Sequence, residues 1–115
     1  MALFPMNVNG GSAAPTLEAE YTQSGGNAIS RTISNAIKIG IVVIASTNNT
    51  SDSSYYEQTI DSLSAGSYEK IDDTYYYADS MGVKTTTYII KNVPSGATIS
   101  IKARYVGVIQ IIKII

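Results

Sequence analysis

The side chains of this sequence best suited to chemistry are five carboxylates in its second half: Glu57, Asp61, Glu69, Asp72 and Asp73. Such a group could form a calcium site or the acid pair of a glycosidase. Calcium needs several oxygen ligands at short, defined spacing, and no loop of this sequence has the alternating acidic pattern with a central glycine. A glycosidase needs two carboxylates facing each other across a cleft, which sequence spacing does not establish. We interpret these residues as solvated side chains at strand edges and turns.

Cysteine, histidine and tryptophan are absent from the 115 residues. Without a thiol or an imidazole, the chain lacks the groups behind most nucleophilic and acid–base mechanisms that run near neutral pH. It also lacks the nitrogen and sulfur ligands that zinc prefers, and no disulfide can stabilise the fold. We therefore expect a protein that is not an enzyme, with no catalytic residue, no metal site and no cofactor.

The charge of the chain is low and evenly distributed, with 8 basic and 9 acidic residues and a net charge of −1. A nucleic-acid-binding protein normally carries a basic patch, but here only Lys102 and Arg104 would share a strand face. No segment approaches the roughly 20 apolar residues that span a bilayer, and residues 1–11 lack the basic start of a signal peptide. We expect no nucleic-acid or membrane partner, and synthesis in the cytoplasm with no evident signal peptide.

Tyrosines occur in two clusters, at residues 55–56 and 75–77. Adjacent residues of a strand point to opposite faces, so Tyr75 and Tyr77 share one face and Tyr76 takes the other. Tyrosine suits interfaces because its ring buries area while its hydroxyl remains hydrogen-bonded. We predict Tyr75 and Tyr77 as interface residues. Packing inside the protein and a platform for sugar rings are the alternatives.

The composition indicates an all-β fold. Isoleucine and valine together number 24 against 3 leucines, and 11 threonines and 9 tyrosines add to the residues that suit a pleated sheet. About seven to eight short strands, spaced by about 8–12 residues, predict an antiparallel β-sandwich, a jelly-roll-like fold or a small barrel. The length fits one domain. We divide the chain into an extended arm, residues 1–15, and a single β domain, residues 16–115.

Alternating apolar residues locate the strands of the first half. Residues 16–22 form the first strand. Residues 30–46 form either two strands or one long strand bent at Gly40, with a helix over residues 27–37 as an alternative. Apolar residues on both faces of the second half of this segment predict that it is covered on both sides. Residues 46–54 are polar and predict a solvated loop.

Strands are also expected in the second half at residues 55–61, 68–72 and 73–78. Residues 83–91 and 97–105 are predicted to form an antiparallel hairpin across the turn at residues 92–96. The final segment, residues 106–115, closes the chain, with Gly107 as a candidate bulge in one long strand that bends there.

Both ends of the chain carry apolar residues that need cover. Near the start, Leu3, Phe4 and Met6 either pack back on their own domain or reach a neighbouring subunit. At the end, an exposed edge this apolar would promote aggregation, so its own sheet or a neighbouring protomer must cover it. We take these C-terminal residues as further interface candidates: Ile109, Ile111, Ile112, Ile114 and Ile115.

The opening MALFPM, the β body rich in Gly, Ser, Asn and Thr, and the missing Cys, His and Trp resemble small bacteriophage and prophage virion proteins. Decoration, tail-associated and fibre-attachment subunits share this overall character, which extends over the whole chain without a single defining motif. The resemblance implies a β-sandwich or jelly-roll-like module that repeats around a symmetric particle. It also implies a location in the virion and two partners, which are further copies of the chain and other virion structural proteins.

Two other function classes remain open. A carbohydrate-binding or adhesion module would use the tyrosines as a stacking platform for a glycan. A surface filament subunit would add its C-terminal strand to the sheet of a neighbour.

Overall fold

The structure, a computed structural model, describes residues 14–23 and 25–115, which are mostly β-strands. The predicted all-β fold is confirmed. The arm residues Leu3, Phe4 and Met6 lie outside the described residues. The elements in chain order are β1 (Thr16–Gln23), β2 (Ile29–Thr32), β3 (Ile37–Asn48), the short 3-10 helix η1 (Ser53–Tyr55), β4 (Gln58–Leu63), β5 (Ser67–Ala78), β6 (Met81–Val93), β7 (Thr98–Ala103) and β8 (Gly107–Lys113).

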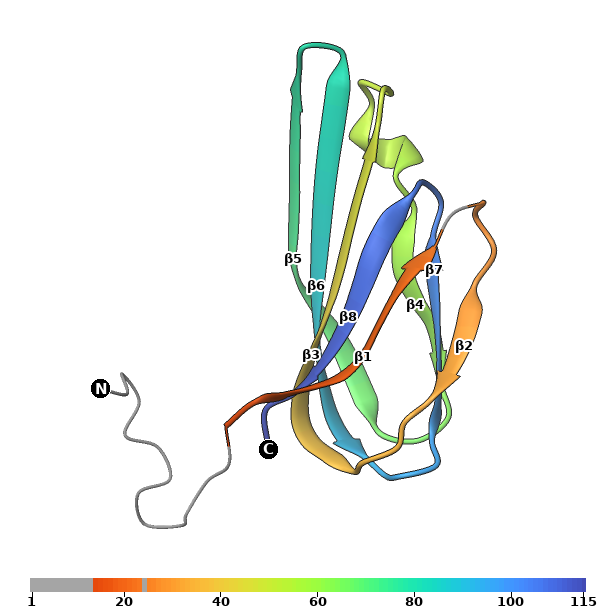
Figure 1. Cartoon of the computed structure of the whole chain (residues 1–115), viewed down its shortest axis with the longest axis vertical. Helices are drawn as coiled ribbons and strands as arrows, with labels where there is room; N and C mark the ends of the chain where they lie inside the picture. Colours follow the sequence, from red (N-terminus) through yellow and green to blue (C-terminus); the bar gives the residue numbers. More distant parts are fainter. Residues whose placement is uncertain (1–13, 24) are drawn as a thin grey trace, which may run out of the picture.

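The strands form two antiparallel sheets that pack face to face as a sandwich (Figure 1). The large sheet has the order β1-β8-β3-β6-β5 and the small sheet the order β2-β7-β4. The pairs β1–β8, β2–β7 and β3–β6 are nested, as in a jelly roll folded from one long hairpin. The innermost pair of that pattern, β4 with β5, is replaced, because β5 pairs with β6 in the large sheet.

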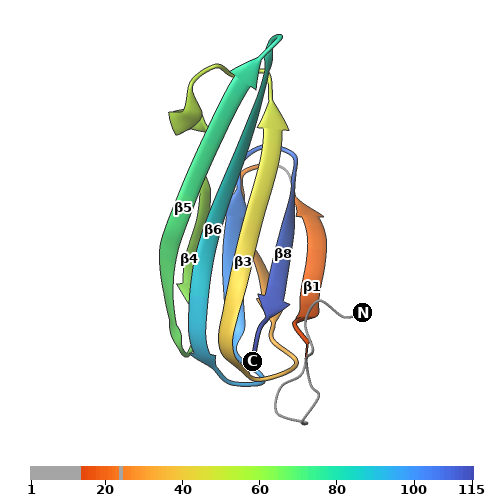
Figure 2. The ribbon, with the colours of Figure 1, turned by 90° about the vertical axis from the view of Figure 1, so that its left-hand side faces the viewer.

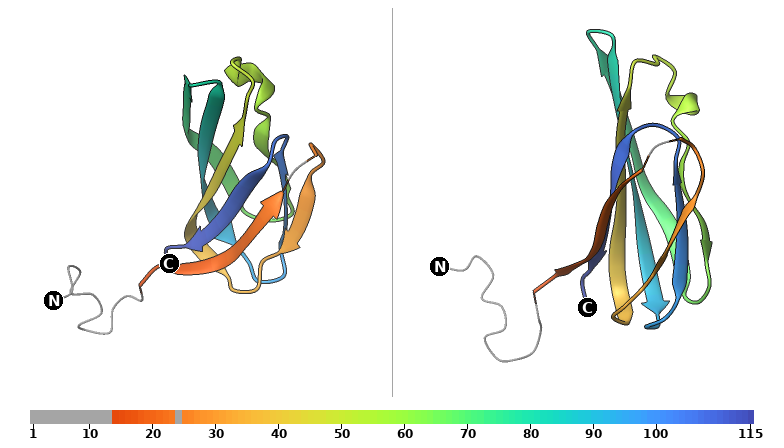
Figure 3. Two further views of the ribbon diagram at one scale, coloured as in Figure 1. Left: turned by 45° about the horizontal axis from the view of Figure 1, so that its top comes forward. Right: turned by 45° about the vertical axis from the view of Figure 1, so that its right-hand side comes forward.

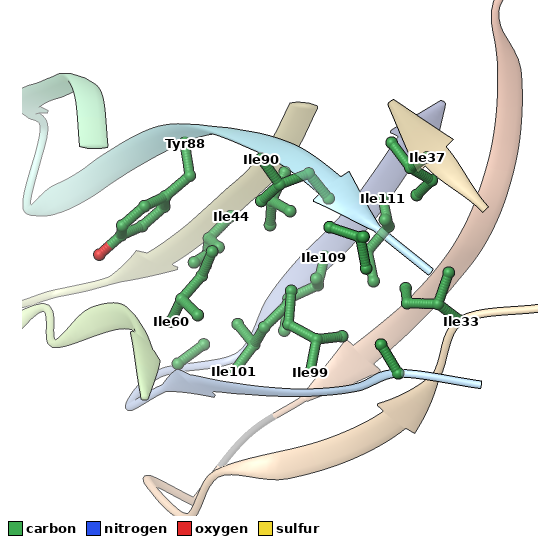
Figure 4. Close-up of a cluster of buried hydrophobic side chains, with 14 residues drawn as sticks. Ile33, Ile37, Ile44, Ile60, Tyr88, Ile90, Ile99, Ile101, Ile109 and Ile111 are labelled. Atoms are coloured by element: carbon green, nitrogen blue, oxygen red, sulfur yellow. The ribbon is translucent and has the colours of Figure 1, made fainter. Parts of the chain in front are cut away.

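Isoleucines from both sheets fill the core (Figure 4). The large sheet contributes Ile44, Ile90 and Ile109, and the small sheet contributes Ile99 and Ile101, all fully buried. Each strand places every second side chain on the inner face, which explains the alternation in the sequence. The β-branched side chains suit this pleated interior, so the composition that predicted strands also provides the packing.

The predicted hairpin between residues 83–91 and 97–105 is wrong, although both strands exist. β6 belongs to the large sheet and β7 to the small sheet, and the turn between them crosses the sandwich. Asn92 and Gly96 adopt positive φ angles of 55° and 92°, and the buried Val93 and Ala97 lie at the two sides of the crossing. The alternation of apolar and polar residues shows that each strand has one buried face. Two strands in opposite sheets produce the same alternation as two paired strands of one sheet.

Residues 30–46 form two strands, which was one of the expected arrangements, but the break lies at residues 33–36 and not at Gly40. The backbone amide of the buried Ile33 donates to Ala97 O at 2.8 Å, which holds this link against the β6–β7 turn. β3 runs through Gly40 without a register shift. A Cβ atom at Gly40 would lie 2.8 Å from Ile112 O, so close packing requires glycine there. The alternative helix does not form.

Two further boundaries differ from the prediction. Residues 53–55 form η1 and the strand begins only at Gln58, because Asp52 accepts a hydrogen bond of 2.9 Å from the Ser54 amide and caps the helix. Residues 67–78 form one strand, β5, in place of two pieces, with a register shift between Lys70 and Asp72. The β5–β6 hairpin extends the large sheet beyond the short strands of the small sheet (Figures 1 and 3).

The C-terminal segment is covered by its own sheet, which was one of the two arrangements expected. β8 lies between β1 and β3 and pairs with both. It is not a continuation of β7, because the chain changes sheets at residues 104–106, so Gly107 is no bulge in a long strand.

Candidate functional site

Tyrosines close one end of the sandwich, where the large sheet extends beyond the small one. Tyr56, only 1% exposed, lies at the centre of this cluster. Its ring centroid lies 5.3 Å from that of Tyr75 and 5.0 Å from that of Tyr105. Its hydroxyl donates to the carbonyls of Asn48 at 3.0 Å and Thr50 at 2.8 Å. Residues 49–57 are thereby tied to the inner face of the long strands.

The predicted interface residues Tyr75 and Tyr77 lie on the same face of β5, as expected, but that face is the inner one. The Tyr75 hydroxyl donates to Thr50 O at 2.9 Å, so this side chain supports the end of the sandwich. Tyr77 is 38% exposed, whereas Tyr76 on the opposite face is 69% exposed. A Cβ atom at Gly82 would collide with the Tyr56 hydroxyl, so the facing strand needs glycine beneath the cluster.

A polar network crosses the core beside the tyrosines. Gln58 of β4 is 3% exposed, and its side-chain amide donates to Ile44 O at 2.9 Å and to Thr86 Oγ1 at 3.1 Å. Its carbonyl accepts a hydrogen bond from the Ser46 hydroxyl. Thr86 donates in turn to Asp73 Oδ1 at 2.7 Å. The network therefore connects the small sheet to three strands of the large one.

Asp73 ends this network near the surface, where Lys70 Nζ lies 3.4 Å and Lys84 Nζ 3.6 Å from Asp73 Oδ2. Partial burial pushes the pKa of Asp73 upward, but the Thr86 hydrogen bond and the two lysine charges outweigh it and lower this pKa below its ordinary value. Burial raises the pKa of Tyr56, and the neighbouring tyrosines add to that rise. Both pKa shifts thus arise from burial, hydrogen bonds and neighbouring side chains within the fold.

The five carboxylates do not gather into a metal site. In the described ranges, no group of three or more His, Cys, Asp or Glu residues is placed to hold a metal ion. Asp61 and Asp72 each accept a hydrogen bond of 2.8 Å from a nearby threonine, Thr59 and Thr74. Glu57 Oε1 lies 3.4 Å from Lys102 Nζ. Among residues 14–23 and 25–115, no helix is long and apolar enough to cross a membrane.

The C-terminal interface candidates divide between the core and the surface. Ile109 and Ile111 are completely buried between the two sheets, so the interface prediction for them is wrong: in this fold their side chains cannot reach a neighbouring subunit. Ile112 and Ile114 are partly exposed, and Ile115 is 46% exposed. Both edges of β8 are paired, so this strand has no free edge to add to the sheet of a neighbour.

Ile112 belongs to a larger apolar surface on the side of the large sheet that faces away from the core. Figure 2 views this side, and the small sheet lies behind it. Strand register places Leu17, Ile112, Ile41 and Ile89 side by side in one row across β1, β8, β3 and β6. We name as the outer apolar face the following outward residues: Leu17, Ile39, Ile41, Val43, Ala45, Val83, Ile89, Val108 and Ile112.

No described element covers this face. Leu17 is 53% exposed, Val83 42% and Val108 41%, and the remaining members are partly exposed. Charged side chains lie at its borders, with Glu20 on β1, Glu69 on β5 and Lys91 on β6 beside Ile39. An apolar centre with a polar rim is the usual anatomy of a protein interface.

The outward side of the small sheet has the opposite character. Its outward positions, which alternate with core residues such as Ile60, Ile99 and Ile101, are all polar. They are Ser30, Thr32, Thr59, Ser62, Thr98, Ser100 and Lys102. The sandwich is therefore one-sided, with one water-compatible outer surface and one apolar outer surface.

The comparisons with known proteins found no relative. No family model, curated protein or solved structure matches the chain. The candidate site is thus defined by the geometry of the described residues, and we take the outer apolar face as that site.

Sequence reasoning selected Ile112 but missed the rest of this face. The signal was present in the run Ile41–Val42–Val43–Ile44, where apolar residues of both parities predicted cover on both sides of the strand. Val42 and Ile44 are covered by the small sheet. Ile41 and Val43 point outward and remain partly exposed.

Proposed function

We propose that this protein is a non-enzymatic structural subunit of a bacteriophage particle, a head decoration or a tail- or fibre-associated protein. It works by self-assembly and by docking on other virion proteins, and it carries out no catalysis. The observation that carries the proposal is the contrast between the outer apolar face of the large sheet and the polar outer surface of the small sheet.

A structural subunit needs one surface that binds neighbours and another that tolerates water. Contiguous exposed apolar patches mark interaction sites on soluble proteins. The outer apolar face supplies such a patch on rigid strands, while the small sheet presents hydroxyl groups. The resemblance of the sequence to small virion proteins supports placing this subunit in a phage particle.

The experiment is to purify particles from a bacterial culture whose phage or prophage encodes the chain. Mass spectrometry of the particles should detect the chain at many copies per particle, and immunogold electron microscopy should locate it on the head or the tail. A matched culture with the coding sequence deleted is the control. Particles that lack the chain would overturn the proposal.

A second candidate, a carbohydrate-binding module, is favoured by one observation. Tyr55 is 52% exposed on the rigid η1 turn, and the Arg104 guanidinium lies 5.8 Å from its ring. An exposed aromatic ring beside hydrogen-bond donors can stack on a sugar. Glycan binding that is lost in Tyr55→Ala and kept in Tyr76→Ala would support this function instead.

A further inference from the structure

We infer that the outer apolar face binds the same face of a second copy of this chain, so that the large sheets of two protomers pack against each other. The inference rests on the proposed structural role and adds the partner and the contact surface. Its basis is the strand register, the burial of the outward residues and the distribution of charge over the large sheet.

The face is uncharged at its centre, where Thr85 and Thr87 of β6 and Gln110 of β8 lie between the apolar side chains. Along β3, the central strand, Ile39, Ile41, Val43 and Ala45 all point outward. Register sets Ile41 between Ile112 and Ile89, and Ala45 between Val108 and Thr85. The uncharged residue Gln110 interrupts the apolar side chains of β8, and its amide donates to Glu20 Oε2 at 2.6 Å.

The shape of the face favours another sheet as its partner. A twisted antiparallel sheet packs well on a second sheet of the same twist, at a separation of about 10 Å and with the strands inclined by about 30°. A second copy presents such a sheet, and the rim of the face carries both signs of charge, with Glu20, Glu69 and Asp72 beside Lys91. Two-fold symmetry makes this contact self-complementary and closed.

The size of the face sets the expected strength of the contact. The four strands that carry the face, each about 4.8 Å wide, and a length of about 27 Å along residues 39–47 of β3 give roughly 500 Å² per copy. The total of about 1,000 Å² is at the lower limit of specific interfaces, where complexes are weak or transient. We therefore expect a dimer that dissociates in the micromolar range and that a larger assembly would reinforce.

Analytical ultracentrifugation of the full-length chain, from about 1 to about 500 μM, tests the inference. The wild type should shift from monomer to dimer over this range. Ile41→Thr with Val43→Thr keeps both side chains β-branched and the fold intact, and should weaken the dimer at least tenfold. Ser100→Glu, at the centre of the polar outer surface of the small sheet, is the matched control and should change the dissociation constant less than twofold.

A covalent probe gives an independent test, because the chain has no natural cysteine. Val43 lies near the middle of the central strand, so Val43→Cys should meet its own copy close to the two-fold axis. A short thiol-reactive cross-linker should give a covalent dimer with Val43→Cys and none with Ser100→Cys at equal concentration.

Three outcomes would overturn the inference. They are a monomer at every concentration, a dimer that the double threonine variant does not weaken, and cross-linking at residue 100 in place of residue 43. A monomeric wild type that dimerises after Leu3→Ser with Phe4→Ser would assign the face to residues 1–13 of the same chain. Each of these outcomes removes self-assembly through this face but leaves the chain's presence in particles, which the particle purification tests separately.

Discussion

The Gln58 side-chain amide donates a hydrogen bond of 3.1 Å to Thr86 Oγ1 across the space between the two sheets. Gln58 belongs to the small sheet and Thr86 to the large one, and both are almost completely buried. Isoleucine packing alone is non-directional and tolerates small sliding of one sheet over the other. This polar pair fixes one relative position of the sheets, since other positions would leave buried polar groups unpaired.

Replacing Gln58 by leucine should destabilise the fold by about 2–3 kcal/mol. The substitution keeps the volume similar but leaves the Ser46 hydroxyl and Ile44 O without their partner. Urea unfolding followed by circular dichroism measures the effect. Ser62→Ala, at an exposed outward position of the same strand, is the control and should change stability by less than about 0.5 kcal/mol. A Gln58→Leu variant as stable as the wild type would contradict the structural role of the network.

Asp73 should make stability sensitive to acid. Its folded-state pKa is lowered, so its contribution is present above the unfolded pKa near 4 and is lost as the pH falls through the lower folded pKa. Urea midpoints between pH 6 and pH 2 should therefore fall less steeply in Asp73→Asn than in the wild type. The difference should stay within about 1 kcal/mol, because the carboxylate is partly exposed and solvent screens its ion pairs. Thr86→Val, which removes one donor to this carboxylate, should show part of the same flattening, and parallel profiles for all three proteins would contradict the assignment.

The sequence predicted the class of fold and the positions of most strands, because both follow from alternation and β-branched composition. It did not predict which strands pair. Residues 83–91 and 97–105 alternate correctly, yet Asn92 and Gly96 direct the chain into the other sheet, and alternation carries no information on that choice. The core location of Ile109 and Ile111 depends on β8 inserting between β1 and β3, which is a long-range pairing.

The outer apolar face illustrates the same limit in the candidate site. The apolar run at residues 41–44 indicated that both sides of the strand are covered, and one of these sides faces the core. That Leu17 and Ile89 join Ile41 in one row depends on the register of strands far apart in the sequence. The local sequence pattern therefore identified β3 as a strand, but the outer apolar face is defined only by the pairing of strands far apart in the sequence.

Removing the Tyr56 hydroxyl should loosen the tyrosine end without unfolding the domain. Tyr56→Phe loses the donor to Asn48 O and Thr50 O, and should cost about 1–2 kcal/mol. Tyr75→Phe, which leaves Thr50 O bonded to Tyr56, should cost less. In Tyr56→Phe, amide hydrogen exchange should accelerate relative to the wild type, and the acceleration should be larger in residues 49–57 than in β7. Uniform acceleration over the whole domain would show that the hydroxyl supports global stability and not this end.

Truncation at the C-terminus separates the core role of β8 from the role of its last residues. Deleting residues 108–115 removes Ile109 and Ile111 and splits the large sheet between β1 and β3, so we expect an insoluble chain. Deleting only residues 114–115 removes four backbone hydrogen bonds, among them Lys38 N to Ile115 O at 2.7 Å, and leaves the core intact. The shorter deletion should fold with a free energy of unfolding lowered by about 1–3 kcal/mol. Expression yield, circular dichroism and urea unfolding of both variants measure this, and a soluble, folded chain without residues 108–115 would contradict the central position of β8.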